Sequence, residues 1–112
     1  MKSMQSILKK VSDVLSQING INIYHYWRPK MQAPFCVWAE QNEGEPSYAG
    51  NKKTEKQFEG TLDYFTHAEF DPIVDEIVTA LDSIDGLSYM LESVQYEEDT
   101  QLIHYTYSWS IA

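Results

Sequence analysis

The hydrophobic and polar positions of this chain change their period several times along its length. From Met4 to Ile18, apolar residues recur at intervals of three and four, which is the spacing of an amphipathic helix. Ser3 precedes this stretch as a candidate N-cap, and Gly20 follows it as a candidate C-terminal glycine. The pattern therefore predicts a first helix near the start of the sequence.

A second helical period follows later in the chain. Its apolar stripe is formed by Phe70, Ile73, Val74, Ile77, Leu81 and Ile84. Asp71 is a candidate N-cap, Pro72 suits the first helical position, and Gly86 stands where the helix can end. The acidic residues Asp75, Glu76 and Asp82 fall on the opposite side of this predicted helix.

The remaining apolar stretches have the composition or the alternation of strands. Residues 21–28 and 35–40 are rich in β-branched and aromatic residues, which predicts two strands joined by a loop. Residues 55–67 alternate, and Gly60 within them predicts a bulge or the close approach of a neighbour. The stretches 87–98 and 102–112 predict a hairpin. One apolar face of its last strand comprises Ile103, Tyr105, Tyr107, Trp109 and Ile111.

The order of these elements is α-β-β-(long loop)-β-α-β-β. Alternating strands and two amphipathic helices predict an α+β fold, with a mostly antiparallel sheet and both helices packed on one face. The 112 residues are expected to form a single domain.

The long loop at residues 41–54, QNEGEPSYAGNKKT, interrupts this pattern. Its glycines, proline and polarity predict a flexible segment that the core does not need. Tyr48 offers an amphipathic anchor, and Lys52 and Lys53 form a local positive patch. The loop is therefore a candidate for binding a partner, and a surface insertion without a partner is the alternative.

The two early strands carry apolar residues on both faces, which implies that something covers the second face of the sheet. In a domain of this size, we expect the cover to be another copy of the chain. The candidate residues for that interface are Tyr24, Tyr26, Arg28 and Trp38.

The net charge of −9 is unevenly distributed. Residues 1–34 carry five cations and one carboxylate, for a charge of +4. Residues 35–54 carry −1, and residues 55–112 carry thirteen carboxylates and one lysine, for −12. This distribution argues against binding nucleic acid through its phosphates. It favours contact between a basic patch of one copy and an acidic patch of the next, unless the acidity serves solubility alone.

Motifs for catalysis, phosphate binding and metal binding are absent from the sequence. The single cysteine, Cys36, lies between apolar residues and is expected to be a small buried side chain. His25, His67 and His104 fall on three different predicted strands. We therefore expect no enzymatic activity, no cofactor and no bound metal. The first twenty residues contain no uninterrupted apolar run, so we expect neither a signal peptide nor a membrane span, and a cytosolic product.

The ordered pattern as a whole resembles the tail-terminator family of long-tailed bacteriophages, whose members are also called tail-completion, head–tail joining or minor capsid proteins. The resemblance is carried by the N-terminal helix, the stretches YHYWRP, PFCVWAE, FEGTLDYFTH and FDPIVDEIVTALD, the polar loop and the C-terminal hairpin. The resemblance covers nearly the whole chain. It rests on the order and length of the elements and on their general residue pattern.

This resemblance implies a subunit of a hexameric ring that caps the tail tube and offers a surface to the head connector. It also implies no catalysis and no cofactor, and places the protein in the host cytoplasm and then in the virion. Asp75, Glu76 and Asp82 of the second helix are candidates for the wall of the lumen of the ring, where carboxylates would repel DNA.

Two alternatives remain open at the level of sequence. One is a small ligand-binding or enzymatic domain, with a pocket lined by Tyr24, Tyr26, Trp38 and His67. The other is a different neck or capsid-associated component of the same virion.

Overall fold

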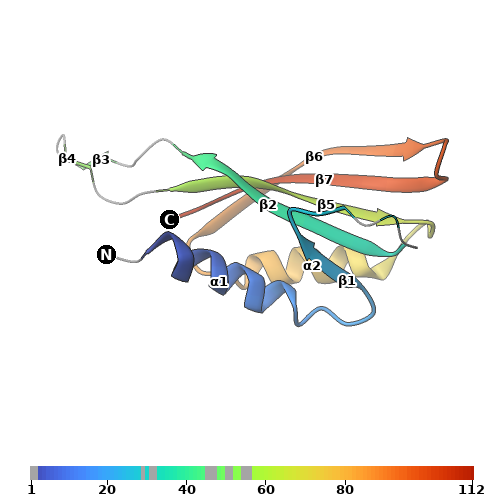
Figure 1. Cartoon of the computed structure of the whole chain (residues 1–112), viewed down its shortest axis with the longest axis horizontal. Helices are drawn as coiled ribbons and strands as arrows, with labels where there is room; N and C mark the ends of the chain where they lie inside the picture. The colour runs from blue at the N-terminus through green and yellow to red at the C-terminus, as the bar shows by residue number, and fades with distance from the viewer. Residues whose placement is uncertain (1–2, 29, 31–32, 45–47, 50–51, 54–56) are drawn as a thin grey trace.

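The computed structural model describes residues 3–28, 30, 33–44, 48–49, 52–53 and 57–112. Helices α1 (Met4–Leu15) and α2 (Pro72–Asp82) lie on the same side of a five-stranded sheet (Figure 1). The sheet consists of β1 (Asn22–His25), β2 (Phe35–Glu43), β5 (Phe58–Thr66), β6 (Leu87–Glu97) and β7 (Leu102–Ile111). The short strands β3 (Tyr48–Ala49) and β4 (Lys52–Lys53) form a separate pair. The predicted α+β fold is confirmed.

The strands lie in the order β1-β2-β5-β7-β6, with β1 and β6 at the edges. All neighbours are antiparallel except β1 and β2, which are parallel. The chain therefore has to return from the end of β1 to the start of β2 instead of turning directly. The return starts at Tyr26, whose φ of 73° turns the backbone. It then carries the guanidinium carbon of Arg28 to 4.2 Å from the ring centroid of Phe65 on β5.

Helix α1 begins as the sequence predicts and ends earlier. Ser3 is its N-cap, and the Ser3 hydroxyl accepts a 3.1 Å hydrogen bond from the backbone N–H of Ser6. The helix ends at Leu15 with Ser16 as its C-cap. Gly20, with a φ of 86°, therefore serves the turn towards β1 and not the end of the helix.

Helix α2 is capped by Asp71, whose Oδ1 accepts a 2.9 Å hydrogen bond from the N–H of Ile73. The helix ends at Asp82, and Gly86 lies beyond it in the turn to β6, with a φ of 82°. Phe70 does not belong to the buried stripe, contrary to the prediction, because it precedes the cap with a φ of 55° and its side chain is 97% exposed.

The main core fills the space between the helices and the sheet. Its buried members include Leu8, Val11, Leu15, Trp38, Leu62, Tyr64, Ile77, Leu81, Tyr107 and Trp109. The alternation predicted for β5 and β7 holds at most positions. Phe58, Leu62 and Tyr64 of β5 and Tyr107, Trp109 and Ile111 of β7 belong to this core, whereas Phe65 and Leu102 lie on the other face of the sheet. The indole N–H of the buried Trp109 has a hydrogen-bond partner, because it donates a 2.9 Å hydrogen bond to the carbonyl oxygen of Thr61.

Gly60 lies at both a bulge and a close approach, as predicted. The register between β2 and β5 shifts between Glu40 and Asn42, next to Gly60. A Cβ on Gly60 would overlap the carbonyl oxygen of Ala39 and would lie 2.5 Å from Cζ2 of Trp109. The absence of a side chain at this position lets β2 and Trp109 pack against β5.

Candidate interaction surfaces

The face of the sheet that is turned away from the helices has an apolar part. Phe35, Phe65 and Leu102 form a buried cluster there, and Tyr24 and Val37 pack against it. The guanidinium of Arg28 lies over the Phe65 ring from the segment that follows β1. The chain therefore buries these three side chains itself, so they need no second copy to cover them, and the expected cover of the rest of this face remains a prediction.

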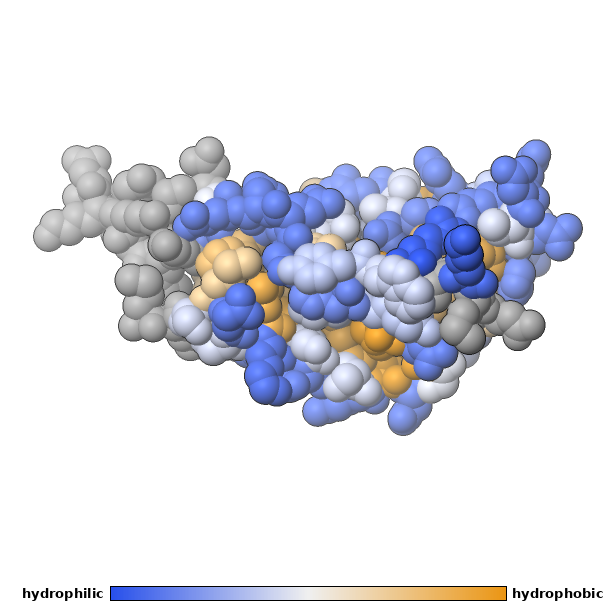
Figure 2. Space-filling model, viewed as in Figure 1, coloured by the Kyte–Doolittle hydropathy of each residue, from blue (hydrophilic) through white to orange (hydrophobic). Residues whose placement is uncertain are grey.

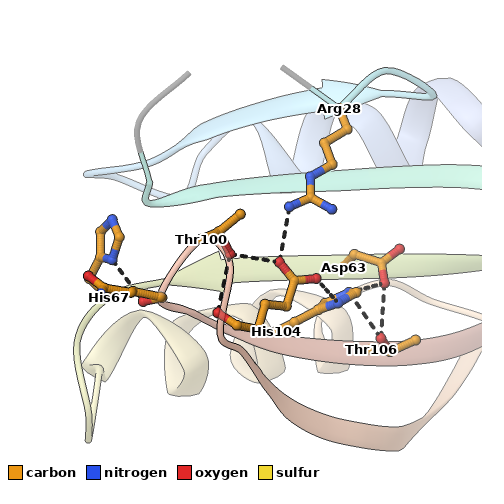
Figure 3. Close-up of polar contacts among 8 residues, drawn as sticks. Arg28, Asp63, His67, Thr100, His104 and Thr106 are labelled. Carbon is orange, nitrogen blue, oxygen red and sulfur yellow. Dashed lines mark hydrogen bonds and ion pairs between the residues drawn. The ribbon is translucent and has the colours of Figure 1, made fainter. Parts of the chain in front are cut away.

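A network of charged and polar side chains continues across the same face (Figure 3). Arg28 Nη2 donates a 3.1 Å hydrogen bond to Oε1 of Glu97, and Oε2 of Glu97 lies 3.3 Å from Nδ1 of His104. The other ring nitrogen of His104 lies 2.7 Å from Oδ1 of Asp63, which also accepts a 3.0 Å hydrogen bond from Thr106. The network thus connects the segment after β1 with three strands of the sheet.

The charge of Glu97 is stabilised within this network. Burial raises its pKa, but hydrogen bonds from Arg28 and Thr100 and the charges of Arg28 and His104 outweigh burial and lower it. The network of Arg28, Glu97, His104 and Asp63 therefore holds the segment after β1 against the sheet.

In the part of the chain that the structure describes, no group of three potential metal ligands comes together.

The four interface residues expected from the sequence lie in different environments. Tyr24 is half-buried in the apolar cluster, and Arg28 is paired with Glu97. Tyr26 is 62% exposed and stacks on the imidazole of His25, with ring centroids 3.9 Å apart. Trp38, in contrast, is only 2% exposed and belongs to the main core. Trp38 is thus a core residue, and its assignment to an interface was wrong.

We define the β1 edge surface as Tyr26, Trp27 and Lys30; Arg28 does not belong to it, because its guanidinium reaches Phe65 on β5 and Glu97 on β6. Trp27 is 60% exposed and contacts the ring of Tyr24 edge-on, at a centroid distance of 5.4 Å. Trp27 was not among the interface residues expected from the sequence, and the positive φ of Tyr26 turns the backbone just before it. The succession of Tyr, Trp and Arg was the available signal, since these types dominate the energetics of protein interfaces.

We define the β6 edge surface as Leu91, Val94, Tyr96, Glu98 and Asp99. Leu91, Val94 and Tyr96 are in register with the core-facing residues of β7, so they point to the helix side of the sheet. They are nevertheless exposed, because β6 diverges from α2 towards its C-terminal end (Figure 1). This stretch was predicted as part of a hairpin, and its exposure was not predicted.

The predicted partner-binding loop is shorter than expected at its start, because β2 continues to Glu43. Within it, Tyr48 pairs with Lys53 and Ala49 with Lys52, as strands β3 and β4. This pair lies beyond one end of the sheet (Figure 1). The side chains of Tyr48, Lys52 and Lys53 lie outside the described part of the structure, as do residues 45–47, 50–51 and 54, so the expected flexibility and docking role remain predictions.

The acidic residues assigned to a lumen, Asp75, Glu76 and Asp82, are all exposed on α2. Asp82 accepts a 2.6 Å hydrogen bond from the hydroxyl of Tyr89, which raises the pKa of Tyr89. Glu76 lines a groove between α1 and α2. Their exposure is compatible with a lumen, which only an assembly defines.

The pocket of the alternative hypothesis does not form. Tyr24 and Trp38 lie on opposite faces of the sheet, and Nδ1 of His67 contacts the carbonyl oxygen of Gln101 at 3.0 Å. An open groove of about 460 Å³ lies elsewhere, near Gly60, and none of the four expected residues lines it. Its lining includes Gln41, Asn42, Thr61, Ser88, Ser108 and Ser110.

Cys36 is fully buried, as expected, and burial together with the charge of Asp63 raises the pKa of its thiol. His25 contacts Glu40 at 2.6 Å, while His67 and His104 have the separate partners described above. No helix in the described ranges has both the length and the apolar character needed to span a membrane.

Comparison of the sequence with models of known protein families and with curated proteins gives no match. Figure 2 shows that the face turned to the viewer is mostly hydrophilic and carries its apolar surface in separate small areas. The described residues define a small α+β domain with exposed apolar side chains on the segment after β1 and on β6.

Proposed function

We propose that this protein is a virion structural component of the tail-terminator type, which closes as a ring on the finished tail tube and presents a surface to the head connector. The observation that carries the proposal is the element order. Two helices cover one face of a mostly antiparallel sheet, and a polar insertion bearing β3 and β4 stands beyond one end of that sheet (Figure 1). The same order underlies the resemblance noted in the sequence.

The distribution of charge supports this role. Asp75, Glu76 and Asp82 are exposed on one helix of a protein with a net charge of −9. On the wall of a lumen, such carboxylates repel the phosphates of passing DNA and prevent tight binding. Measurable binding of the purified protein to duplex DNA at physiological salt would contradict this part of the proposal.

Electron microscopy of the purified protein, alone and with tail tubes of the same virion, tests the function. We expect rings, six-fold in projection, and tubes that carry a cap and no longer elongate. A protein that forms no ring in either condition is not a tail terminator. A different neck component would instead form rings that bind connectors and leave tube elongation unchanged, so tube length separates these two roles.

A further inference from the structure

Strand β6 loses its cover on the helix side of the sheet as it runs towards its C-terminal end. Near its start, Tyr89 is half-buried, and its hydroxyl donates a hydrogen bond to Asp82 of α2. Farther along, the helix-side residues Leu91, Val94 and Tyr96 are 45%, 50% and 60% exposed. An apolar row that begins against the core and continues into solvent is typical of a contact with another protein.

Helix α2 borders this apolar row with carboxylates. Asp75 and Asp82 are seven positions apart in the sequence, which places them on the same side of α2 and about 10 Å apart along its axis. Asp82 contacts Tyr89 of β6. Burial raises the pKa of Tyr107 on β7, and the neighbouring Tyr105 and Asp75 raise it further. Both observations place this side of α2 towards β6 and β7.

The elements around the apolar row contain no strong cation. Neither lysine nor arginine occurs in α2, β5, β6 or β7, and Glu98 and Asp99 follow β6 at its end. Among the described residues, Asp75, Glu98 and Asp99 have no ion-pair partner. Arg28 reaches β6 only through Glu97, on the opposite face of the sheet. The complementary partner therefore presents apolar side chains flanked by lysine or arginine.

We propose that the surface between α2 and β6 binds a basic amphipathic helix of a partner protein. The partner helix lies beside α2 on the same side of the sheet and extends the layer that α1 and α2 form (Figure 1). Its apolar side chains, spaced by three and four positions, pack against Leu91, Val94 and Tyr96. Cations seven positions apart on its flank meet Asp75 and Asp82. The inference goes beyond the proposed function, because it concerns a partner and not the closure of a ring.

The structure favours a helix over an added β-strand and a different protein over a second copy. The register between β6 and β7 shifts between Leu91 and Ser93, and bulges of this kind oppose continuous pairing at a sheet edge. The exposed apolar side chains also point to the side on which both helices lie. Within this chain, helix α1 carries Lys9 and Lys10, but it buries its apolar face in its own core. Helix α1 of another copy therefore has no free apolar face to offer.

A designed peptide tests the proposal with the full-length protein. The peptide has about 18 residues, or about five helical turns, with leucines on one face and lysines on both flanks of that face. A second peptide carries glutamate in place of every lysine, and a third carries two central prolines that prevent the helix. In fluorescence anisotropy, the basic helical peptide should bind at least about tenfold more tightly than either of the other two.

Two matched pairs of variants locate the binding surface. Asp75→Lys should weaken binding of the basic peptide at least about fivefold. Glu76→Lys makes the same change of charge on the part of α2 that lines the groove with α1, and should alter the affinity by less than about twofold. Tyr96→Ser should also weaken binding, whereas Phe70→Ser should not, because Phe70 is an exposed aromatic residue that belongs to neither α2 nor β6. Circular dichroism confirms that the four variants are folded.

Several results would overturn the inference. These are equal affinities for the three peptides, equal weakening by Asp75→Lys and Glu76→Lys, and no binding of the basic peptide at protein concentrations up to about 1 mM. Wild-type dimers that Tyr96→Ser dissociates would also overturn it, because a second copy would then occupy the surface. A protein that caps tail tubes and binds none of the peptides would refute the inference and leave the proposed function standing. Specific binding of the basic peptide by a protein that never caps tubes would support the inference and refute the proposed function.

Discussion

The hydroxyl of Tyr64 donates a 2.6 Å hydrogen bond to Oδ2 of Asp71, and this contact joins strand β5 to the N-cap of helix α2. Thr66 donates a second hydrogen bond, of 2.7 Å, to the same oxygen, while Oδ1 accepts from the N–H of Ile73. One carboxylate thus starts the helix and fixes it to the sheet.

Replacing Asp71 with alanine should lower the free energy of unfolding by about 2 kcal/mol, because the helix loses its cap and two hydroxyl groups lose their acceptor. Urea denaturation followed by circular dichroism measures the change. Asp75→Ala is the matched control, since Asp75 is an exposed carboxylate in the first turn of the same helix. Equal losses in the two variants would show that the contacts of Asp71 add nothing.

The same carboxylate should contribute to the loss of stability in acid. Burial raises the pKa of Asp71, but the hydrogen bonds from Tyr64, Ile73 and Thr66 outweigh it and lower the pKa below its ordinary value. Its contribution is therefore complete above the unfolded pKa of about 3.9 and is lost as the pH falls through the lower, folded value. Between about pH 5 and pH 2, Asp71→Asn should lose less stability than the wild type. Identical acid profiles of the two proteins would contradict the argument.

Gly60→Ala should destabilise the fold by about 2 to 3 kcal/mol, because the new methyl group meets the backbone of Ala39 and the ring of Trp109. Gly44→Ala is a suitable control. The three atoms nearest to its methyl group would all belong to the flexible side chain of Glu59, which can move away, and a change of about 0.5 kcal/mol is expected. Thermal unfolding compares them, and a Gly60 variant as stable as the Gly44 variant would exclude the close packing at the bulge.

Trp38→Glu should prevent folding or lower the free energy of unfolding by at least about 4 kcal/mol, because the substitution removes a core side chain and introduces a buried charge. Trp27→Glu should change stability by less than about 1 kcal/mol, since Trp27 is exposed. Circular dichroism and solubility distinguish the two. A folded and stable Trp38→Glu protein would contradict the assignment of Trp38 to the core.

Replacing residues 45–54 with a short Gly-Ser linker should leave the thermal midpoint nearly unchanged, because the described residues of the main core and all five strands of the main sheet lie outside this range. Under the proposed function, the variant should fail to cap tail tubes. Normal capping would show that the insertion has no role in docking, whereas loss of folding would show that the fold depends on it.

Local features of the sequence determined much of the fold. Ser3 and Asp71 mark the starts of both helices because capping depends on residues only a few positions apart. The alternation of β5 and the glycine at its bulge could also be predicted from the sequence, since successive side chains of a strand point to opposite faces of the sheet. The order of elements followed from these signals.

The tertiary structure decided which face of each strand meets the helices and which edge stays open. Alternation places the side chains of Val37 and Trp38 on different faces of β2, but it does not say which face meets the helices. The parallel pairing of β1 with β2 depends on contacts between segments that are distant in the sequence. The exposure of Tyr96 arises because β6 diverges from α2. Pairing, register and the divergence of a strand from a helix are non-local, so they became visible only in the folded chain.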